Sequence, residues 1–260
     1  MAVVLDLDGV VWLVDRPIPG SPEAIARLRA AGERVWFLTN NSNPTLATLT
    51  AKLAGMGIPA LAQEVLSSAA TAASLLPPGS TALVCAGDGV REALAARGVR
   101  EVTVADGAGA VPDAVLIGLT MAFDYEQLKA ASVAIRRGAR FVATNDDATY
   151  PTPDGPIPGT GSLVAAVRTA SGHEPEIAGK PYPPTVERIR QETHGEELLV
   201  VGDRPDTDGL LAQRLGARFA LVLTGVTARA DLPVSPEPDV VAEDLAEVVR
   251  GLPGPQAGGR

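Results

Sequence analysis

Four short segments of the sequence gather carboxylate, hydroxyl, amide and ammonium side chains. They are Asp6-Leu7-Asp8-Gly9, Thr39-Asn40-Asn41, Gly179-Lys180-Pro181 and Gly202-Asp203, the last followed by Asp208. Several carboxylates at one place repel one another unless a divalent cation joins them, and oxygen ligands favour Mg²⁺. A lysine and a Thr/Asn pair of donors beside such a cation suit a phosphoryl group. The residue types therefore predict a magnesium-assisted site for phosphoryl chemistry.

The spacing of Asp6 and Asp8 indicates how such a site would react. Because they are two residues apart at the end of a strand, their side chains point the same way. One carboxylate can attack phosphorus in line, while Lys180 and the cation offset the phosphate charge and Thr39 and Asn40 hold its oxygens. The second carboxylate is then placed to protonate the leaving alkoxide and later to take a proton from the hydrolytic water.

Three of these segments follow short apolar runs that are typical of strands, at residues 2–5, 35–38 and 198–201. The first run is continuously apolar, which suits a strand covered on both faces. Segments of helical period alternate with the runs, including residues 45–56, for which Asn43 is the expected cap and Pro44 the expected first helical residue. This alternation predicts an α/β protein with a doubly wound, mostly parallel sheet, in which ligands bind beyond the carboxyl ends of the strands.

A second series of strand-like and helix-like segments occupies residues 81–143. The last third of the chain, in contrast, completes the sheet that the first third begins. We therefore expect a core made of residues 1–79 and 174–260, with a smaller α/β cap domain, residues 80–173, inserted between its parts. An inserted domain of this size would roof the site and favour small substrates over phosphoproteins.

The composition narrows the classes of partner and metal. With 22 Lys+Arg against 31 Asp+Glu in 260 residues the net charge is −9, so the chain lacks the basic stripe that nucleic acid or an anionic membrane requires. Cys85 is the only cysteine, which excludes an internal disulfide, and with two histidines it cannot build a Cys/His zinc site. The N-terminus lacks the features of a signal peptide and no apolar stretch is long enough to span a bilayer, so we expect a cytoplasmic protein.

Four residues outside the four segments carry less specific expectations. Asn145 and Asp147, in the expected cap, fit a turn as well as a contact with substrate. Trp12 follows the first segment, and packing is favoured over a role at the substrate. Cys85 lies in a strand-like run and is expected to be a small buried hydrophobe.

The four segments, in this order, resemble the four motifs of the haloacid dehalogenase (HAD) superfamily phosphatases. The inserted part is similar to the cap of the NagD-like branch, which includes p-nitrophenyl phosphatases, at residues 113–118, 144–147 and 153–161. The resemblance extends from Val3 to about Val241. It implies a HAD-like core with an inserted α/β cap.

The resemblance also implies a role for each motif residue. Asp6 would be the nucleophile that forms an aspartyl phosphate, Asp8 the general acid/base whose backbone carbonyl also reaches Mg²⁺, and Asp203 a metal ligand. Thr39 and Asn40 would hold the phosphoryl group, and Lys180 would orient it together with Asp6. In the fourth motif Pro205 stands where a large apolar residue is common, and an additional acid, Asp206, follows it. Whether Asp206 or Asp208 faces the metal is open, and the spacing Gly-Asp-x-x-x-Thr-Asp favours Asp208.

By this resemblance the protein is expected to be a Mg²⁺-dependent phosphatase of small phosphorylated metabolites. Phosphoglycolate, glycerol phosphate, sugar, nucleoside and pyridoxal phosphates and p-nitrophenyl phosphate all fit, and a homodimer is compatible with the family. Two alternatives are a receiver-like module that keeps a phosphoryl group on its aspartate and a phosphate-binding protein without turnover. A receiver requires only about half of this length and has no inserted domain, so the hydrolase is favoured.

Overall fold

The computed structural model describes residues 1–103, 111–150, 152 and 155–252. Its contacts divide the chain into two compact units. The first contains Met1–Thr39, Thr50–Leu66 and Val186–Arg260, and the second contains Asn40–Leu49 and Ser67–Thr185. Pro153 and Asp154, which belong to one of the segments that resemble the NagD-like cap, lie outside the described residues.

The first unit is built on a six-stranded sheet with the order β15-β14-β13-β1-β4-β5. Its strands are β1 (Ala2–Asp6), β4 (Arg34–Thr39), β5 (Val65–Ser67), β13 (Leu198–Gly202), β14 (Arg218–Val222) and β15 (Val240–Ala242). The pairs from β15 to β4 are parallel. Every residue of β1 is buried, as its continuous apolar run predicts. A two-stranded ribbon of β2 (Trp12–Leu13) and β3 (Arg16–Pro17) follows β1.

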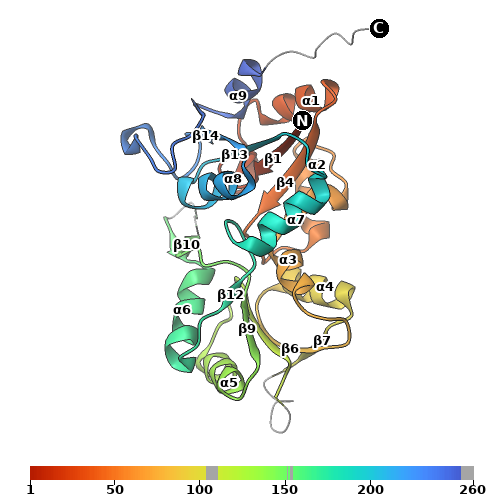
Figure 1. Ribbon diagram of the computed structural model, residues 1–260, viewed down its shortest axis with the longest axis vertical. Coiled ribbons are helices and arrows are strands. Elements are labelled where there is room, and N and C mark those ends of the chain that lie inside the picture. The colour runs from red at the N-terminus through yellow and green to blue at the C-terminus, as the bar shows by residue number, and fades with distance from the viewer. Residues whose placement is uncertain (104–110, 151, 153–154, 253–260) are drawn as a thin grey trace. The chain divides into compact units, whose positions relative to one another are not determined.

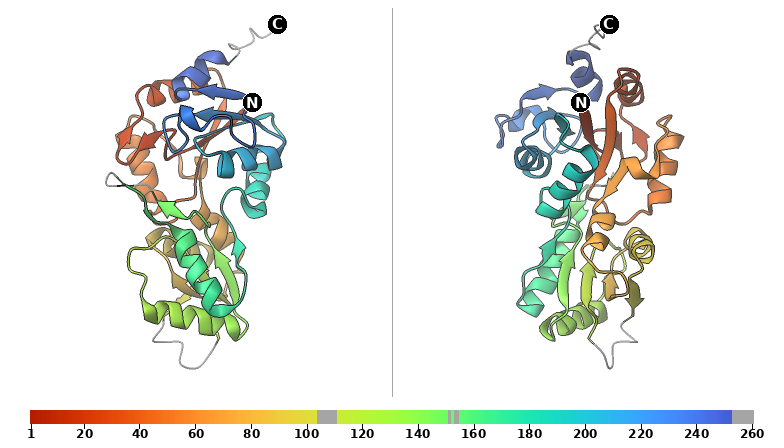
Figure 2. Two further views of the ribbon diagram at one scale, coloured as in Figure 1. Left: turned by 90° about the vertical axis from the view of Figure 1, so that its left-hand side faces the viewer. Right: turned by 45° about the vertical axis from the view of Figure 1, so that its right-hand side comes forward.

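Helices cover this sheet because each has one apolar face. They are α1 (Ser21–Ala30), α2 (Leu46–Gly55), α7 (Pro183–Thr193), α8 (Leu210–Leu215) and α9 (Leu245–Gly251), and the division into units falls within α2 and α7. Short turns lie at Ala62–Glu64, Pro205–Gly209 and Arg229–Asp231. Ile189 of α7 and Leu211 of α8 pack on one face of the sheet, against Val4 and Val200 among others. Figure 2 shows helices on both faces of the strands.

The second unit contains a five-stranded sheet with the order β12-β9-β8-β6-β7, in which all neighbouring pairs are parallel. The strands are β6 (Thr81–Cys85), β7 (Arg100–Val102), β8 (Ala114–Ile117), β9 (Arg140–Ala143) and β12 (Glu176–Ile177). Helices α3 (Ser68–Ser74) and α4 (Asp88–Arg97) pack on one face, and α5 (Tyr125–Arg136) and α6 (Thr160–Ser171) on the other. A hairpin of β10 (Thr149–Tyr150) and β11 (Ile157–Pro158) precedes α6. The expected doubly wound α/β class is confirmed.

The boundaries of the units differ from the predicted ones, which were 1–79 with 174–260 for the core and 80–173 for the cap. Residues 40–49, 67–79 and 174–185 group with the five-stranded sheet instead. The physical reason is packing: α3 shares an apolar core with α4 on that sheet, and β12 adds to its edge beside β9. The roles of core and cap themselves stay predictions.

The start of α2 also differs from the prediction. The helix begins at Leu46, and the hydroxyl of Thr45 accepts a hydrogen bond from the Thr48 N–H at 3.1 Å, so Thr45 caps it in place of Asn43. The Asn43 N–H instead donates to the Asn41 side chain at 3.1 Å. An Asx turn therefore occupies the position where the sequence predicts the cap.

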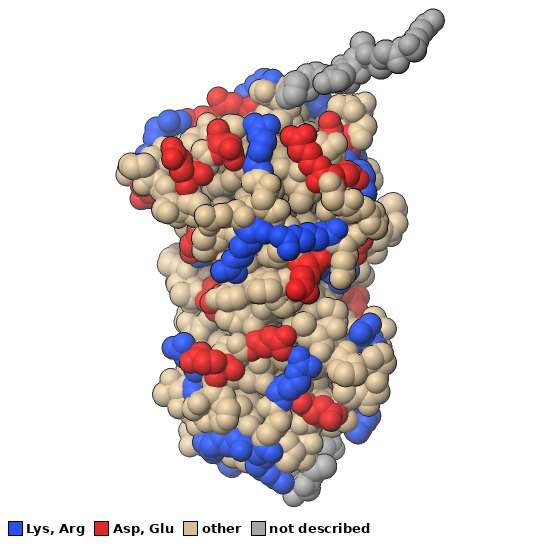
Figure 3. Space-filling model, viewed as in Figure 1, with Lys and Arg blue, Asp and Glu red and all other residues tan. Residues whose placement is uncertain are grey.

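On the face drawn in Figure 3, lysines and arginines are interspersed with acidic side chains. Among the described residues, no helix is both long enough and apolar enough to cross a membrane.

We predict that Cys85 is unreactive in the folded protein. It is fully buried in β6, and burial raises the pKa of its thiol to about 12, so the thiolate that reacts with disulfide reagents is absent at pH values near 8. We expect no reaction with dithiobis-nitrobenzoate in buffer and one thiol per chain in urea. Reaction of the native protein at the rate of a free thiol would contradict this burial.

The replacement Leu116→Ala tests the core of the second unit. Leu116 is fully buried in β8, the middle strand of the five-stranded sheet, and its truncation is expected to cost about 2–5 kcal/mol of the free energy of unfolding. The exposure of the Cys85 thiol along a urea titration reports the unfolding of this unit. Val133→Ala on the exposed side of α5 is the control and should change the midpoint little. Equal effects of the two replacements would refute the assignment of Leu116 to the core.

Candidate active site

Three buried carboxylates meet at one edge of the six-stranded sheet. Asp6 is the last residue of β1, Asp203 follows β13, and Asp208 lies in the turn Pro205–Gly209. One oxygen of each lies within 4.8 Å of the other two, and the residues are 7%, 2% and 1% exposed. Buried charges of one sign repel strongly, and this donor set of oxygens fits a hard divalent cation. The trio of Asp6, Asp203 and Asp208 is therefore suited to holding a metal ion.

The register of the sheet explains why Asp6 and Asp203 meet. Strand β1 lies between β13 and β4, with Leu5 opposite Val201 and Asp6 opposite Leu38. Since all three strands are parallel, their carboxyl ends open at the same edge, as Figure 1 allows the reader to follow. Thr39, the last residue of β4, is buried at this edge too.

Three glycines allow the carboxylates to lie against the backbone. Gly9 has φ +87°, and a Cβ there would lie 2.6 Å from the Asp203 carboxylate carbon. A Cβ on Gly202 would collide with the Asp208 side chain, and one on Gly225 with that of Asp203. Gly9 and Gly202 lie in the motifs predicted from the sequence, whereas Gly225 lies outside them, and its only signal is its place in the loop after the next strand, β14. Any side chain at these positions would displace a carboxylate.

Backbone donors hold all three carboxylates. The Leu7 N–H donates to Asp6 Oδ1 at 2.8 Å. The Val226 N–H donates to Asp203 Oδ2 at 2.6 Å, and the Arg204 N–H donates to Asp208 Oδ2 at 3.2 Å. The hydroxyl of Thr224 donates to the Gly9 carbonyl, which ties the loop after β14 to the loop after β1. Hydrogen bonds from the backbone orient the carboxylates without adding further charge.

Asp206 and Asp208 have different surroundings. Asp206 is 65% exposed and forms a two-point ion pair with Arg204, with nitrogen–oxygen distances of 2.8 and 3.2 Å. Asp208 is turned inward by the Pro205–Gly209 turn and lies in the trio. The geometry therefore places Asp208, and not Asp206, beside Asp6 and Asp203.

Asp8 lies outside the trio and is half-buried. The indole N–H of Trp12 donates to Asp8 Oδ1 at 2.9 Å, and the Lys52 ammonium lies 4.3 Å from the centre of the indole ring. Trp12 is buried, as expected for a packing residue, and its polar atom also orients Asp8. Nothing near Lys52 in the sequence indicates a contact with Trp12, so this cation–π contact could not be predicted.

A second group of predicted residues meets within the second unit. The side chain of Asn40 pairs with the backbone of Lys180: the Lys180 N–H donates to Asn40 Oδ1 at 2.9 Å, and Asn40 Nδ2 donates to the Lys180 carbonyl at 3.0 Å. Asn40 Nδ2 also donates to Asp147 Oδ2 at 3.1 Å. Asn40 and Lys180 are both buried. The second and third predicted motifs are therefore in direct contact through Asn40.

Asn145 and Asp147 form a turn and also contact Asn40. The Asp147 N–H donates to Asn145 Oδ1 at 3.1 Å, which is the turn that the sequence allows. Asn145 Nδ2 donates to the Asn40 carbonyl at 2.7 Å. Neither of the two alternatives for these residues, a turn or a contact with substrate, predicts this hydrogen bond, because it joins residues more than a hundred positions apart.

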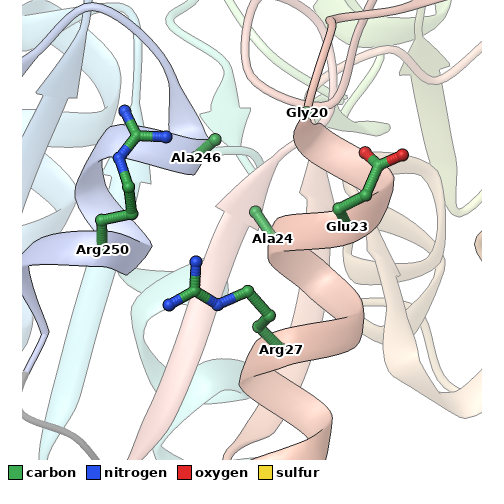
Figure 4. Close-up of a pocket in the computed structure, with 6 residues that line it drawn as sticks. All are labelled: Gly20, Glu23, Ala24, Arg27, Ala246 and Arg250. Carbon is green, nitrogen blue, oxygen red and sulfur yellow. The ribbon is translucent and has the colours of Figure 1, made fainter.

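A pocket of about 410 Å³ lies elsewhere in the first unit, between α1 and α9 (Figure 4). It is lined by Gly20, Glu23, Ala24, Arg27, Ala246 and Arg250. None of the predicted site residues lines this pocket.

Two protein-family models match this chain, one in its N-terminal part and one in its C-terminal part. A model described as haloacid dehalogenase-like hydrolase matches residues 3–100, and a second model of HAD-like hydrolases matches residues 177–248. The D-glycerol 3-phosphate phosphatase of Mycobacterium tuberculosis is 38% identical over 88% of this chain, which spans 64% of that protein. Human chronophin is 37% identical over 96% of this chain and 92% of its own length.

Solved structures agree with the family models. The glycerol phosphate phosphatase of M. tuberculosis in complex with magnesium has a TM-score of 0.85 and 37% identity, covering 94% of this chain and 74% of its own. The p-nitrophenyl phosphatase of Archaeoglobus fulgidus has a TM-score of 0.88 and 30% identity, covering 96% and 98%. NagD of Escherichia coli has a TM-score of 0.84 and 27% identity, covering 95% and 97%. The chain therefore belongs to the haloacid dehalogenase-like hydrolases, in their NagD-like branch of phosphoric monoester hydrolases.

Proposed function

We propose that the protein is a Mg²⁺-dependent phosphatase that hydrolyses phosphomonoesters of small metabolites through an aspartyl phosphate on Asp6. The observation that carries the proposal is the buried trio of Asp6, Asp203 and Asp208. Buried carboxylates placed so closely destabilise the folded protein by their mutual repulsion. The same arrangement is suited to binding a divalent cation, which can in turn bind phosphate. The names of the phosphatases that resemble this chain support the same chemistry.

The proposed reaction has two steps. In the first, a carboxylate oxygen of Asp6 forms a bond to phosphorus, the bond from phosphorus to the ester oxygen breaks, and Asp8 donates a proton to the leaving alkoxide. In the second step, a water molecule attacks phosphorus through its oxygen, and Asp8 takes a proton from that water. This attack breaks the bond to Asp6, releases inorganic phosphate and restores both carboxyl groups. The hydrogen bond from Trp12 to Asp8 orients the general acid for both steps.

The trio of carboxylates fits a divalent cation by its donor type and burial. Asp6, Asp203 and Asp208 would hold Mg²⁺, with the Asp8 carbonyl as a further ligand. When bound, the cation neutralises charge on the phosphoryl oxygens and on the carboxylates around them. The magnesium complex of the mycobacterial phosphatase supports this choice of metal.

Phosphoryl binding is assigned to Thr39, Asn40 and Lys180. Thr39 ends β4 at the same sheet edge as Asp6, and Asn40 follows Thr39 in the chain. Asn40 in turn contacts Lys180, so the second and third motifs are linked by hydrogen bonds. Lys180 would supply a compact positive charge to the phosphoryl oxygens.

The substrate class follows from the proposed cap. The five-stranded sheet and its helices would select the leaving group, and a cap of this size favours small esters such as glycerol phosphate and sugar phosphates. A D-glycerol 3-phosphate phosphatase and an acid sugar phosphatase are among the proteins that this chain resembles. A cytoplasmic location and a homodimer stay predictions from the sequence.

Phosphate release tests the proposed reaction. The purified protein should hydrolyse p-nitrophenyl phosphate and a panel of metabolite phosphates with Mg²⁺ and stop in EDTA. Asp6→Asn should reduce turnover to background, since it replaces the nucleophilic carboxylate by a neutral amide. Lasting phosphorylation of Asp6 without release would indicate a receiver-like module, and phosphate binding without turnover a binding protein. Either result would overturn the phosphatase.

The pair Asp208→Asn and Asp206→Asn tests the metal site. Asp208→Asn should raise the melting temperature in EDTA, because it removes one of three repelling charges, and it should abolish most of the stabilisation by Mg²⁺. For the wild type that stabilisation is about 2.7 kcal/mol at a Mg²⁺ concentration of about 100 times Kd. Asp206→Asn, at the exposed neighbour, is the matched control and should respond to Mg²⁺ like the wild type. Identical responses of the two variants would refute the assignment of Asp208.

A further inference from the structure

The side-chain amide of Asn40 has all of its hydrogen-bonding groups engaged within the second unit. Its oxygen accepts from the Lys180 N–H, and its nitrogen donates to the Lys180 carbonyl and to Asp147 Oδ2, at 2.9, 3.0 and 3.1 Å. An amide nitrogen carries two hydrogens, so both donors are used. Flipping the amide would lose all three bonds, and its orientation is therefore fixed by its partners.

The backbone around this pair is equally constrained. The Asn40 carbonyl accepts from the Ser68 hydroxyl and from Asn145 Nδ2, each at 2.7 Å. A Cβ on Gly179 would lie 2.5 Å from Asn40 Oδ1 and 2.5 Å from the Thr144 carbonyl. A side chain at position 179 would thus push the Lys180 segment away from Asn40. The glycine of the third motif is explained by this close approach.

We infer that the Asn40 side chain is a positioning group that fixes the backbone of Lys180, with Asp147 fixing the amide in turn. This inference deepens the proposed function and rests on it for the task of Lys180. The amide grips both polar groups of one residue, the N–H and the carbonyl, so the Lys180 backbone cannot rotate or shift without breaking a bond. Asn40 then contributes to phosphoryl binding through Lys180 and not through its own amide hydrogens.

The expected size of the effect follows from geometry. Displacement of a reacting or binding group by about 1 Å can cost about 10²-fold in rate. Removing the Asn40 amide also leaves the buried N–H and carbonyl of Lys180 without that partner, which favours movement of the segment. We therefore expect Asn40→Ala to lower kcat/KM for p-nitrophenyl phosphate by about 10- to 100-fold.

A double-mutant cycle separates positioning from direct binding. If Asn40 acts through Lys180, Asn40→Ala in a Lys180→Ala background should cost almost nothing further, because the group that it positions is gone. An undiminished cost in that background would show that Asn40 binds the phosphoryl group itself and would overturn the inference. Asn43→Ala, an exposed asparagine of the same loop, is the matched control for loss of an amide.

A swap of partners gives a second test. Asn40→Asp alone places two carboxylates at hydrogen-bond distance and a carboxylate against the Lys180 carbonyl, so kcat/KM should fall sharply. Adding Asp147→Asn removes the repulsion between the two carboxylates and restores a hydrogen bond between positions 40 and 147 with donor and acceptor exchanged, although the bond to the Lys180 carbonyl stays lost, so activity should recover in part. A direct phosphoryl ligand at position 40 predicts no recovery, because a carboxylate there repels phosphate. Absence of recovery in the folded double variant would overturn the inference.

The pairing of the Asn40 amide with the N–H and carbonyl of Lys180 is a clamp on the Lys180 backbone. Amide hydrogen exchange tests this clamp without any enzymatic reaction. The Lys180 N–H should exchange slowly in the wild type and in Asn43→Ala, and faster in Asn40→Ala. If the wild type hydrolyses no ester but shows this pattern, the proposed function fails and the clamp stands. If Asn40→Ala leaves the exchange of the Lys180 N–H unchanged, the clamp fails whatever the activity.

Discussion

Repulsion among three buried carboxylates is the constraint on which the first unit depends. Asp6, Asp203 and Asp208 place oxygens within 4.8 Å of one another while at most 7% of each residue is exposed. An arrangement of this kind opposes folding in the absence of a cation, since burial and like charge both disfavour the ionised groups. It persists because rigid parallel strands fix where the backbone ends, and because glycines and backbone N–H groups fix where the carboxylates lie.

The residues that form and hold the three carboxylates come from segments that are far apart in the sequence. Strand β1 supplies Asp6 from the middle of the sheet, β13 supplies Asp203 beside it, and the loop after β14 supplies Gly225 and the Val226 N–H. Each strand alone is an ordinary apolar run. Their parallel register converts three separate strand ends into one acidic edge, which is the general reason why ligands bind at the carboxyl ends of such sheets.

The strand ends, the fold class and the order of the motifs could be predicted from the sequence because each depends on local patterns. What could not be predicted depends on contacts between distant residues. Asp206 and Asp208 differ only in the turn that points one outward to Arg204 and the other inward. Lys52 reaches Trp12 from a helix 40 positions away, and Asn40 meets Lys180 across 140 positions. The observed boundaries of the units differ from the predicted ones for the same reason. Helix α3 and strand β12 belong to the five-stranded sheet because of packing and strand pairing that no local pattern in the sequence indicates.

Asparagine suits position 40 for a chemical reason. Its side chain presents a donor and an acceptor side by side, the complement of the N–H and carbonyl of one residue, so that it can hold Lys180 at two points. Threonine or serine offers one hydroxyl and could not make both bonds in this geometry, and aspartate offers no donor. An amide also carries no charge, so it fixes a lysine without offsetting the positive charge that the lysine would present to phosphate. The group best able to position Lys180 is thus one that leaves its electrostatic contribution intact.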